Sequence, residues 1–187
     1  MRRTVLLSLV LLLAAATSGC SMMAPQYSAS IDNVQKLKDG GVMASKVGKF
    51  DSSPDKANAN PISLRGSSLV SPYDNSYAAY IVEAIKQELS LAGKLNSGAD
   101  IEISGVLLKN DIDASGLGTA SGDIAAKFIV KKSGIERYNQ TKTIHHEWDS
   151  SILGAVAIPR AQQMYPQLVQ KLLTALYTDQ DFLQALK

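Results

Sequence analysis

The sequence predicts an α+β fold, a two-layer sandwich in which two main helices pack on one face of a small, mainly antiparallel sheet. Two segments carry apolar residues at helical spacing, residues 77–92 and 160–177. Between them, three segments have the apolar patterning of strands, namely 100–109, 123–131 and 135–148. This order lacks the strict alternation of strands and helices that indicates a parallel sheet. We therefore expect helices on one side of the strands and solvent on the other.

The first twenty residues have the layout of an export signal. Arg2 and Arg3 precede an apolar run, residues 4–16, which is shorter than the ~20 residues of a membrane-spanning helix. The run is followed by Thr-Ser-Gly-Cys, and Cys20 is the only cysteine of the chain. These residues resemble the lipobox of bacterial lipoproteins, although Thr17 stands where a leucine is usual. The alternative is an ordinary signal peptide that contains a cysteine by chance.

The lipobox resemblance implies cleavage before Cys20, a diacylglycerol on its sulfur and a fatty acyl group such as palmitate on its amino group. It divides the chain into a signal peptide (1–19), a lipidated tether (20–29) and a single α+β domain (30–187). Pro25 and the lack of periodicity favour the tether, but Tyr27 could instead pack back onto the domain.

Charge and cysteine content exclude several classes of function. The chain has 19 Lys and Arg against 17 Asp and Glu, and two of the basic residues fall in the signal peptide. The remaining charges balance, which argues against a nucleic-acid surface or a polybasic membrane patch. Because Cys20 is the only cysteine, the domain can contain no disulfide, thiolate nucleophile or cysteine-ligated metal.

The N-terminal third of the domain is expected to contain one short helix and two strands. Ser30 as an N-cap and a Gly-Gly pair after Asp39 predict the helix between them. Residues 42–50 are expected to form the first strand. Residues 51–75 have the composition of a long loop that contains one short strand at 62–65. A loop of this length is either functional or plain surface, and the sequence leaves both readings open.

The clearest helix covers residues 77–92. Asn75 or Ser76 is expected to cap its start, and Gly93 ends it in a left-handed conformation. The apolar stripe of this helix is expected to face the sheet. It consists of Tyr77, Ile81, Ala84, Ile85 and Leu89.

The strand at 100–109 contains Gly105, at a position that suits a bulge or a close contact with a neighbouring element. A loop at 110–122 is expected to connect this strand to a long hairpin. In the hairpin, Gly134 suits the left-handed last position of a three-residue turn, which places Phe128 opposite Tyr138.

The three-residue turn is favoured because a two-residue turn would mix the apolar and polar faces of the hairpin. One face is then covered, and the other faces water. The covered face carries Ile124, Ala126, Phe128, Val130, Tyr138, Ile144 and Trp148. The wet face carries Asp123, Lys127, Lys131, Arg137, Asn139, Thr141, Thr143, His145 and Glu147.

The C-terminal third begins with the apolar run Ile152–Ile158. This run is either a buried connector or an exposed lip for a lipid or a partner protein, and the sequence does not decide between them. A helix is expected to follow at about 160–177, in which Pro166 causes a kink or sets the true start. Asp179 is expected to cap a last short turn.

His145, His146 and Glu147 are the only cluster that suggests metal or acid–base chemistry. Neighbouring strand residues point to opposite faces, so the two histidines cannot share one ion without a bulge. We therefore assign no catalytic, cofactor-binding or metal-binding residue and interpret the cluster as solvated strand side chains. The alternative is a periplasm-facing enzyme, for example a hydrolase that also uses Ser150 or Ser151, or a metal-binding protein that uses His145 and Glu147.

Two other patterns have weaker interpretations as ligand sites. Asp111 and Asp113 lack the fixed spacing of a calcium loop, so a solvated turn is favoured. The glycines between Gly116 and Gly122 do not open a helix, and a phosphate-binding loop normally does.

The layout of the whole chain resembles Gram-negative envelope lipoproteins of the YajG-like type and the auxiliary lipoproteins of lipid-transport (ABC-type) systems. The shared parts are Cys20, a strand, a helix after an irregular loop, a hairpin and a leucine-rich C-terminal helix. Only Cys20 carries over as a functional residue. Ser21 after the cysteine implies, by the same resemblance, lipid anchoring at the outer membrane after export through the inner membrane.

The sequence therefore predicts a lipid-anchored envelope lipoprotein that acts as a non-enzymatic binding or accessory module for a membrane complex or a lipid. It needs no cofactor, and nucleic acid is not among its expected partners. Besides the enzyme or metal-binding alternative, a purely structural envelope protein, for example a homo-oligomer, stays open.

Overall fold

A computed structural model describes residues 21–187 of the chain. The signal peptide 1–19 and the lipidation site Cys20 lie outside the described residues. A four-stranded sheet in the order β2-β5-β6-β7 forms the centre of the fold, with β2 parallel to β5 and the other neighbours antiparallel. These strands are β2 (Ser45–Ser52), β5 (Ile101–Asp113), β6 (Thr119–Lys132) and β7 (Ile135–Asp149).

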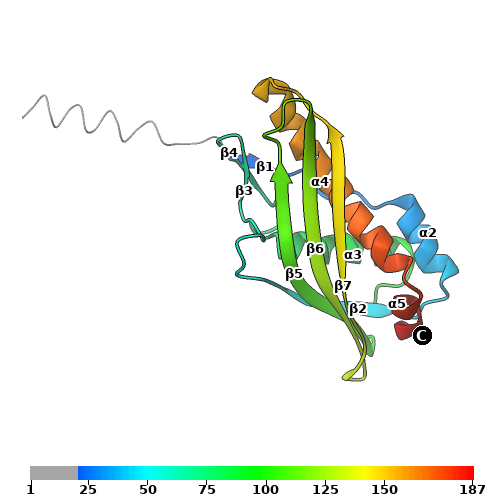
Figure 1. Cartoon of the computed structure of the whole chain (residues 1–187). Coiled ribbons are helices and arrows are strands. Elements are labelled where there is room, and N and C mark those ends of the chain that lie inside the picture. Colours follow the sequence, from blue (N-terminus) through cyan, green and yellow to red (C-terminus); the bar gives the residue numbers. More distant parts are fainter. Residues whose placement is uncertain (1–20) are drawn as a thin grey trace, which may run out of the picture.

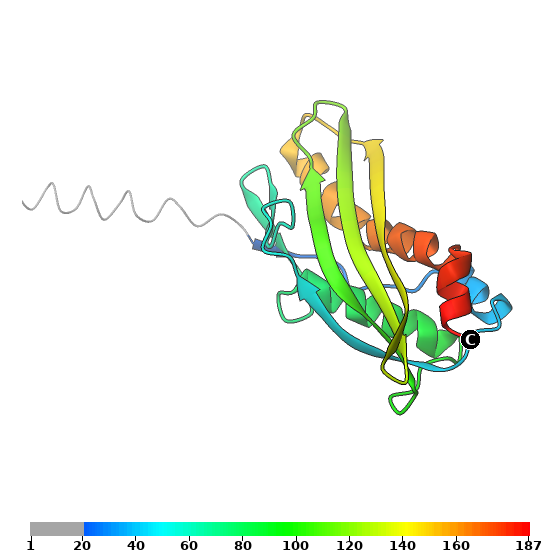
Figure 2. The same cartoon turned by 60° about the horizontal axis from the view of Figure 1, so that its bottom comes forward.

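Two long helices cover one face of this sheet. The helix α3 (Tyr77–Leu91) packs against β2 and β5, and α4 (Gly154–Tyr177) packs against β6 and β7. Figures 1 and 2 show both helices on the same side of the strands. The short helices α2 (Ile31–Asp39) and α5 (Gln180–Ala185) pack against these long helices and the sheet. The predicted α+β fold with two main helices on one face is thus confirmed.

The N-terminal segment differs from the expected tether. Residues Ser21–Met23 form strand β1, which pairs in parallel with β4 (Ser67–Val70), and β4 pairs with β3 (Ile62–Leu64) in a separate three-stranded sheet. Tyr27 packs back onto the domain and is only 4% exposed. Burial of the Tyr27 ring and the pairing of β1 with β4 stabilise the folded conformation of this segment relative to a free, solvated tether.

The second departure concerns residues 110–122, which were expected to form a loop. Strand β5 continues to Asp113 and β6 begins at Thr119, so most of the segment is sheet. Ile112 and Ala120 are buried and extend the core along the ladder. Burial of these side chains outweighs the weak strand preference of the neighbouring Asp, Asn and Gly residues.

The close contact expected at Gly105 is present. A β-carbon on Gly105 would lie 2.1 Å from the carbonyl oxygen of Lys127 and 2.5 Å from the ring of Phe50. Only a residue without a side chain fits between the neighbouring strand and this ring.

The third departure concerns the turn of the β6–β7 hairpin and the register that follows from it. The turn contains two residues, Ser133 and Gly134, both with positive φ (51° and 82°), as the right-handed twist of hairpins favours. A bulge follows, so that Val130 lies opposite Tyr138, where Phe128 was expected. The bulge shifts the pairing by one further residue in the same direction, so the observed register differs from the expected one by two residues. The apolar and polar faces therefore stay separate, as the sequence predicted.

The helix boundaries follow the sequence in α2 and α3 but not in α4. Ser30 and Ser76 accept hydrogen bonds from the main chain at their helix starts, as expected of N-caps. Helix α4 begins at Gly154, about two turns before the expected start, and contains both Pro159 and Pro166. Its first turns lie beside the upper ends of the strands in Figure 1.

Candidate functional site

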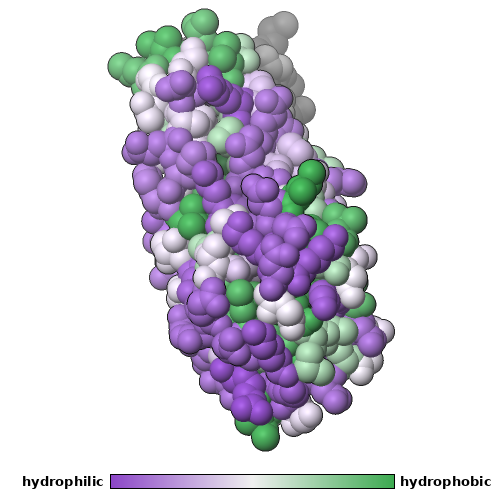
Figure 3. Space-filling view, turned by 90° about the vertical axis from the view of Figure 1, so that its right-hand side faces the viewer, coloured by the Kyte–Doolittle hydropathy of each residue, from purple (hydrophilic) through white to green (hydrophobic). Residues whose placement is uncertain are grey.

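Four large apolar side chains are exposed at the end of the molecule where α4 begins. They are Leu117 in the β5–β6 loop and Ile152, Leu153 and Val156 around the start of α4, with exposed fractions of 73%, 64%, 63% and 48%. We call these four residues the apolar tip. The apolar run that the sequence left open is thus exposed in its first half, whereas Ala157 faces the core. Figure 3 shows apolar surface gathered at this end of the molecule.

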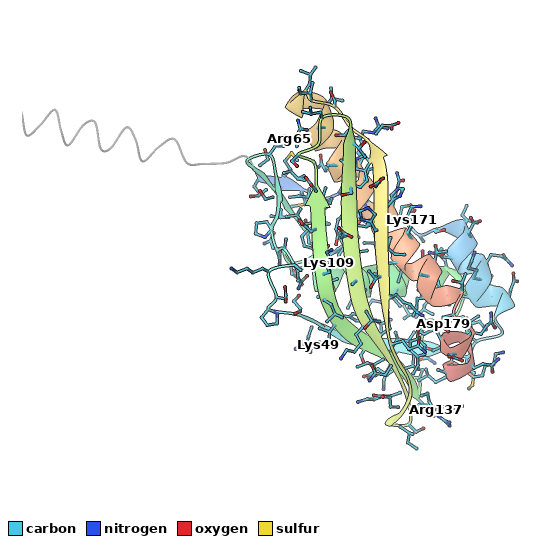
Figure 4. The ribbon with its side chains drawn as sticks, viewed as in Figure 1. Lys49, Arg65, Lys109, Arg137, Lys171 and Asp179 are labelled. Atoms are coloured by element: carbon cyan, nitrogen blue, oxygen red, sulfur yellow. The ribbon has the colours of Figure 1, made fainter. Side chains whose placement is uncertain are left out.

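Arg65 connects the segments that carry the apolar tip through hydrogen bonds to their main chain. It lies in the turn between β3 and β4 with a φ of 49°, and its guanidinium donates to three main-chain carbonyl groups. The Nε–O distance to Ala114 is 2.5 Å, and the two terminal nitrogens lie 2.8 Å from the oxygens of Gly116 and Ile152. These bonds join the β3–β4 turn, the β5–β6 loop and the segment before α4. Figure 4 shows Arg65 at this upper end.

A further main-chain bond fixes the same end. The amide of Ser150 donates to the carbonyl of Gly118 at 2.8 Å, which ties the end of β7 to the loop that carries Leu117. Arg65 was not among the residues predicted to matter for function. The available signal was an Arg-Gly pair between two short apolar segments, which predicts a tight turn but not the partners of the guanidinium.

The described chain starts beside this end of the molecule. Ser21 pairs with Ser68, three residues after Arg65. The side chain of Gln162 on α4 donates to the carbonyl of Met23 at 2.6 Å. Cys20 itself is outside the described residues, but the residue that follows it is part of the folded domain.

A buried carboxylate fixes the rest of the N-terminal segment. Glu88 on α3 is fully buried, and its Oε1 accepts from the hydroxyl of Tyr27 at 2.5 Å, the amide of Ser30 at 3.0 Å and the side-chain amide of Asn33 at 3.2 Å. Asn33 also donates to the carbonyl of Gln170 on α4. We call Tyr27, Ser30, Asn33 and Glu88 the Glu88 node. It joins the N-terminal segment, α2, α3 and α4 at one point.

Burial raises the pKa of Glu88, because removal from water disfavours the charged form, although the three donors act in the opposite direction. The same burial, together with the adjacent carboxylate, raises the pKa of Tyr27 far above its ordinary value. Glu88 was not among the residues predicted to matter for function or for the core. The signal was its spacing, since Glu88 follows Ile81, Ala84 and Ile85 at seven, four and three residues and therefore lies on the apolar stripe of α3.

The structure brings together His145 and Glu147, the two residues of the alternative metal or catalytic site. On the wet face, His145 lies 3.4 Å from Glu147, and its other ring nitrogen lies 3.0 Å from Asp123 on β6. Lys109 on β5 lies 3.4 Å from the same Asp123. Hydrogen bonds to Asp123 and then to Glu147 raise the pKa of His145. We call Asp123, His145 and Glu147 the His145 cluster.

His146 does not join this cluster. It faces the other side of β7, where its ring packs 6.1 Å from that of Trp148, and burial and then Lys171 lower its pKa. Across residues 21–187, no group of three His, Cys, Asp or Glu side chains is arranged to hold a metal ion. The hydroxyl of Ser150 is buried without a hydrogen-bond partner within this range, so the structure does not connect it to a histidine.

The other two sequence patterns also have local structural roles. Asp113 ends β5 and accepts a hydrogen bond from the amide of Ser115 at 2.8 Å. Gly122 lies in β6, where a β-carbon would come within 2.9 Å of Leu168 on α4. Asp111 and Asp113 are therefore at the end of a strand, where the sequence indicated a turn, and Gly122 permits helix packing.

A surface hollow of about 730 Å3 lies toward the opposite end, between β2 and the end of α3. Lys46, Val47, Lys86 and Leu95 are among the residues that line it. It offers a mixed apolar and basic surface at a distance from the apolar tip.

The fold and these sites define a two-layer α+β protein with an apolar end beside its N-terminal strand. Within residues 21–187, no helix is long and apolar enough to cross a membrane. No family model matches the sequence, and no curated protein matches it.

Solved structures show what the fold resembles. Protein XCC0632 from Xanthomonas campestris, a DUF330 protein, superposes with a TM-score of 0.57 at 11% identity, over 84% of this chain and 92% of that one. A candidate lipoprotein from Caulobacter crescentus has a TM-score of 0.46 at 9% identity, over 82% of this chain and 96% of that one. The first likeness shows a shared fold.

Proposed function

We propose that this protein is a bacterial envelope lipoprotein, anchored by lipid on Cys20, and that it acts as a non-enzymatic accessory or binding module for a membrane complex or a lipid. The observation that carries the proposal is the position of β1. The residue after Cys20 is already part of a strand, so a lipid on Cys20 would hold one defined end of the domain at the membrane.

The sequence supports the anchor. A basic head, an apolar run and small residues precede the chain's only cysteine, which is where lipoproteins carry their lipid. Each buried acyl CH2 contributes about 0.8 kcal/mol, so three chains would hold the domain permanently at the membrane. Ser21 after the cysteine favours the outer membrane by resemblance to the sorting of such lipoproteins.

The polar side chains of the wet face support a non-enzymatic role. Both ring nitrogens of His145 are occupied by carboxylates, and His146 lies on the opposite face of β7. The hollow lined by Lys46 and Leu95 is a candidate surface for the partner, since it lies away from the end that carries β1.

The experiment uses the full-length chain with its own signal peptide and a C-terminal tag, expressed in a Gram-negative cell. A palmitate analogue that carries an alkyne reports acylation, and Cys20→Ala is the control. We expect label on the wild type only, in the outer-membrane fraction. A free thiol at Cys20 in the mature protein would contradict the anchor.

The same material tests the accessory role. The tagged protein is purified from detergent-solubilised envelopes, and co-purifying proteins and lipids are measured by mass spectrometry against the Cys20→Ala sample. We expect one complex or lipid species to be enriched with the acylated protein. Acylated protein that enriches nothing above the control would argue for a structural or enzymatic role instead.

A further inference from the structure

The apolar tip is a group of large exposed apolar side chains, whereas exposed apolar side chains on a protein surface are usually scattered singly. Four large side chains gather from two separate segments, the β5–β6 loop and the start of α4, and each is about half exposed or more. Clusters of this kind mark contact with a membrane or another protein.

Hydrogen bonds also fix the backbone of the tip. Leu117 lies between Gly116 and Gly118, whose carbonyl groups accept from Arg65 and from the amide of Ser150, and Ile152 is held by Arg65 as well. The side chains of the apolar tip therefore point into solvent from a backbone whose position is set by these hydrogen bonds.

The β3–β4 hairpin connects the tip to the start of the described chain, because β4 pairs with β1 and Arg65 in its turn binds the tip. Ser68, the partner of Ser21, is three residues from Arg65, a span of at most about 10 Å of extended chain. Arg65 in turn binds the carbonyl of Ile152. A lipid on Cys20 would therefore enter the bilayer beside the tip. Figure 1 shows β1 and the start of α4 at the same end of the molecule.

We propose that the apolar tip inserts into the interfacial region of the same membrane that holds the Cys20 lipid, so that the domain stands on the bilayer by two contacts. This inference rests on the proposed lipid anchor and assigns a second membrane contact to residues that the anchor does not involve. The long strands then point away from the membrane. The β6–β7 turn lies about 45 Å from the tip, since β6 has 14 residues.

The charged residues near the tip indicate whether its insertion requires anionic lipid. Arg160 is exposed one helical turn after Val156, at the level of lipid phosphates if the tip is inserted. Asp113 and Asp149 are exposed at the neighbouring strand ends, and the guanidinium of Arg65, which donates to neutral carbonyl groups, keeps its positive charge. Because these charges offset one another, insertion is driven by apolar burial and does not require anionic lipid.

The test uses the full-length lipidated protein in vesicles, with a fluorophore at one introduced cysteine. Cys20 carries its lipid and is not labelled, so Leu153→Cys gives a single labelled site at the tip. Ile135→Cys is the matched control, since Ile135 is 65% exposed at the β6–β7 turn at the far end of the sheet. Nitroxide groups on lipids quench a fluorophore at the membrane interface, and iodide quenches one in water.

We expect nitroxide lipids to quench the label at position 153 by roughly half, consistent with the shallow insertion of interfacial segments, and to leave the label at position 135 unchanged. The result should be the same in vesicles of phosphatidylcholine alone and of phosphatidylethanolamine with phosphatidylglycerol. Added Ile152→Ser and Val156→Ser changes should expose the label at 153 to iodide while the protein stays on the vesicles.

Three outcomes would overturn the inference. One is equal iodide quenching at positions 153 and 135 in the wild-type background. The second is protection of position 153 only in native envelopes and not in pure lipid vesicles, which would assign the tip to a partner protein. The third is protection that needs anionic lipid.

Vesicle flotation and the intact mass of the protein separate this test from that of the anchor. Protein without a lipid on Cys20 contradicts the proposed function, whereas lipidated protein that floats with an exposed tip contradicts only the insertion of the tip.

Discussion

The Glu88 node and the His145 cluster use the same chemistry in opposite surroundings. Both place carboxylates within hydrogen-bond distance of donors from other elements. Glu88 is fully buried and joins the N-terminal segment to three helices, whereas the His145 cluster is solvated and connects two neighbouring strands. The cluster that the sequence singled out is therefore the one that matters less for stability.

Solvent explains this difference. An exposed ion pair competes with water and salt, so its net contribution is small. Removal of a buried acceptor leaves several donors without water or protein partners, and each unsatisfied donor lowers the free energy of unfolding. In this fold, the contribution of a polar group to stability therefore depends on its burial and not on its resemblance to a catalytic motif.

The largest effect is expected from Glu88→Ala. The change leaves the hydroxyl of Tyr27, the amide of Ser30 and the side-chain amide of Asn33 without their acceptor. We expect a loss of about 3 kcal/mol in the free energy of unfolding. Urea denaturation followed by circular dichroism measures it. Glu88→Gln, which keeps one carbonyl oxygen, is the matched control and should lose less than half as much.

A smaller effect is expected from Tyr27→Phe, which keeps the ring and removes one donor to the buried carboxylate. The expected loss is about 2 kcal/mol, because hydrogen bonds to charged groups are stronger than neutral ones. Tyr80→Phe is the control, since its hydroxyl donates to the uncharged carbonyl of Pro25. A loss as large for Tyr80→Phe would show that the charge on Glu88 adds nothing.

The pH dependence of stability should distinguish the two clusters further. Because burial raises the pKa of Glu88 in the folded state, the folded protein binds more protons than the unfolded chain between the ordinary glutamate pKa of about 4.3 and the raised value. The contribution is full below that window and is lost as pH rises through it. The stability of the wild type minus that of Glu88→Gln should therefore fall with rising pH. A flat difference would contradict the raised pKa.

The smallest effect on stability is expected in the His145 cluster. His145→Ala should leave the free energy of unfolding unchanged, since the side chain is exposed. The chain has two histidines, so NMR can follow both rings. His145 should titrate above the ordinary value of about 6.5 and His146 below it. Asp123→Asn should lower the pKa of His145 and leave that of His146 in place; a common titration of both rings would contradict the pairing.

Local patterns were sufficient for much of the fold. Period and capping located α2 and α3, and the alternation in the β6–β7 hairpin identified the face that the helices cover. The same reasoning was wrong about the turn, because a two-residue turn and a bulge preserve the alternation as well as a three-residue turn does. It was also wrong about residues 110–122, since the burial of Ile112 depends on elements that are distant in the sequence.

The sequence by itself determined the α+β class, the two helices on one face and the single cysteine at position 20, because these depend on composition and on periods within one segment. Only the tertiary structure decided that Tyr27 packs back onto the domain, that Glu88 is a buried acceptor and that Arg65 supports an exposed apolar tip. Each of these depends on groups more than forty residues apart in the chain. A local pattern can indicate which face of a segment is buried, as the apolar stripe of α3 does for Glu88, but it does not show which distant groups lie against that face.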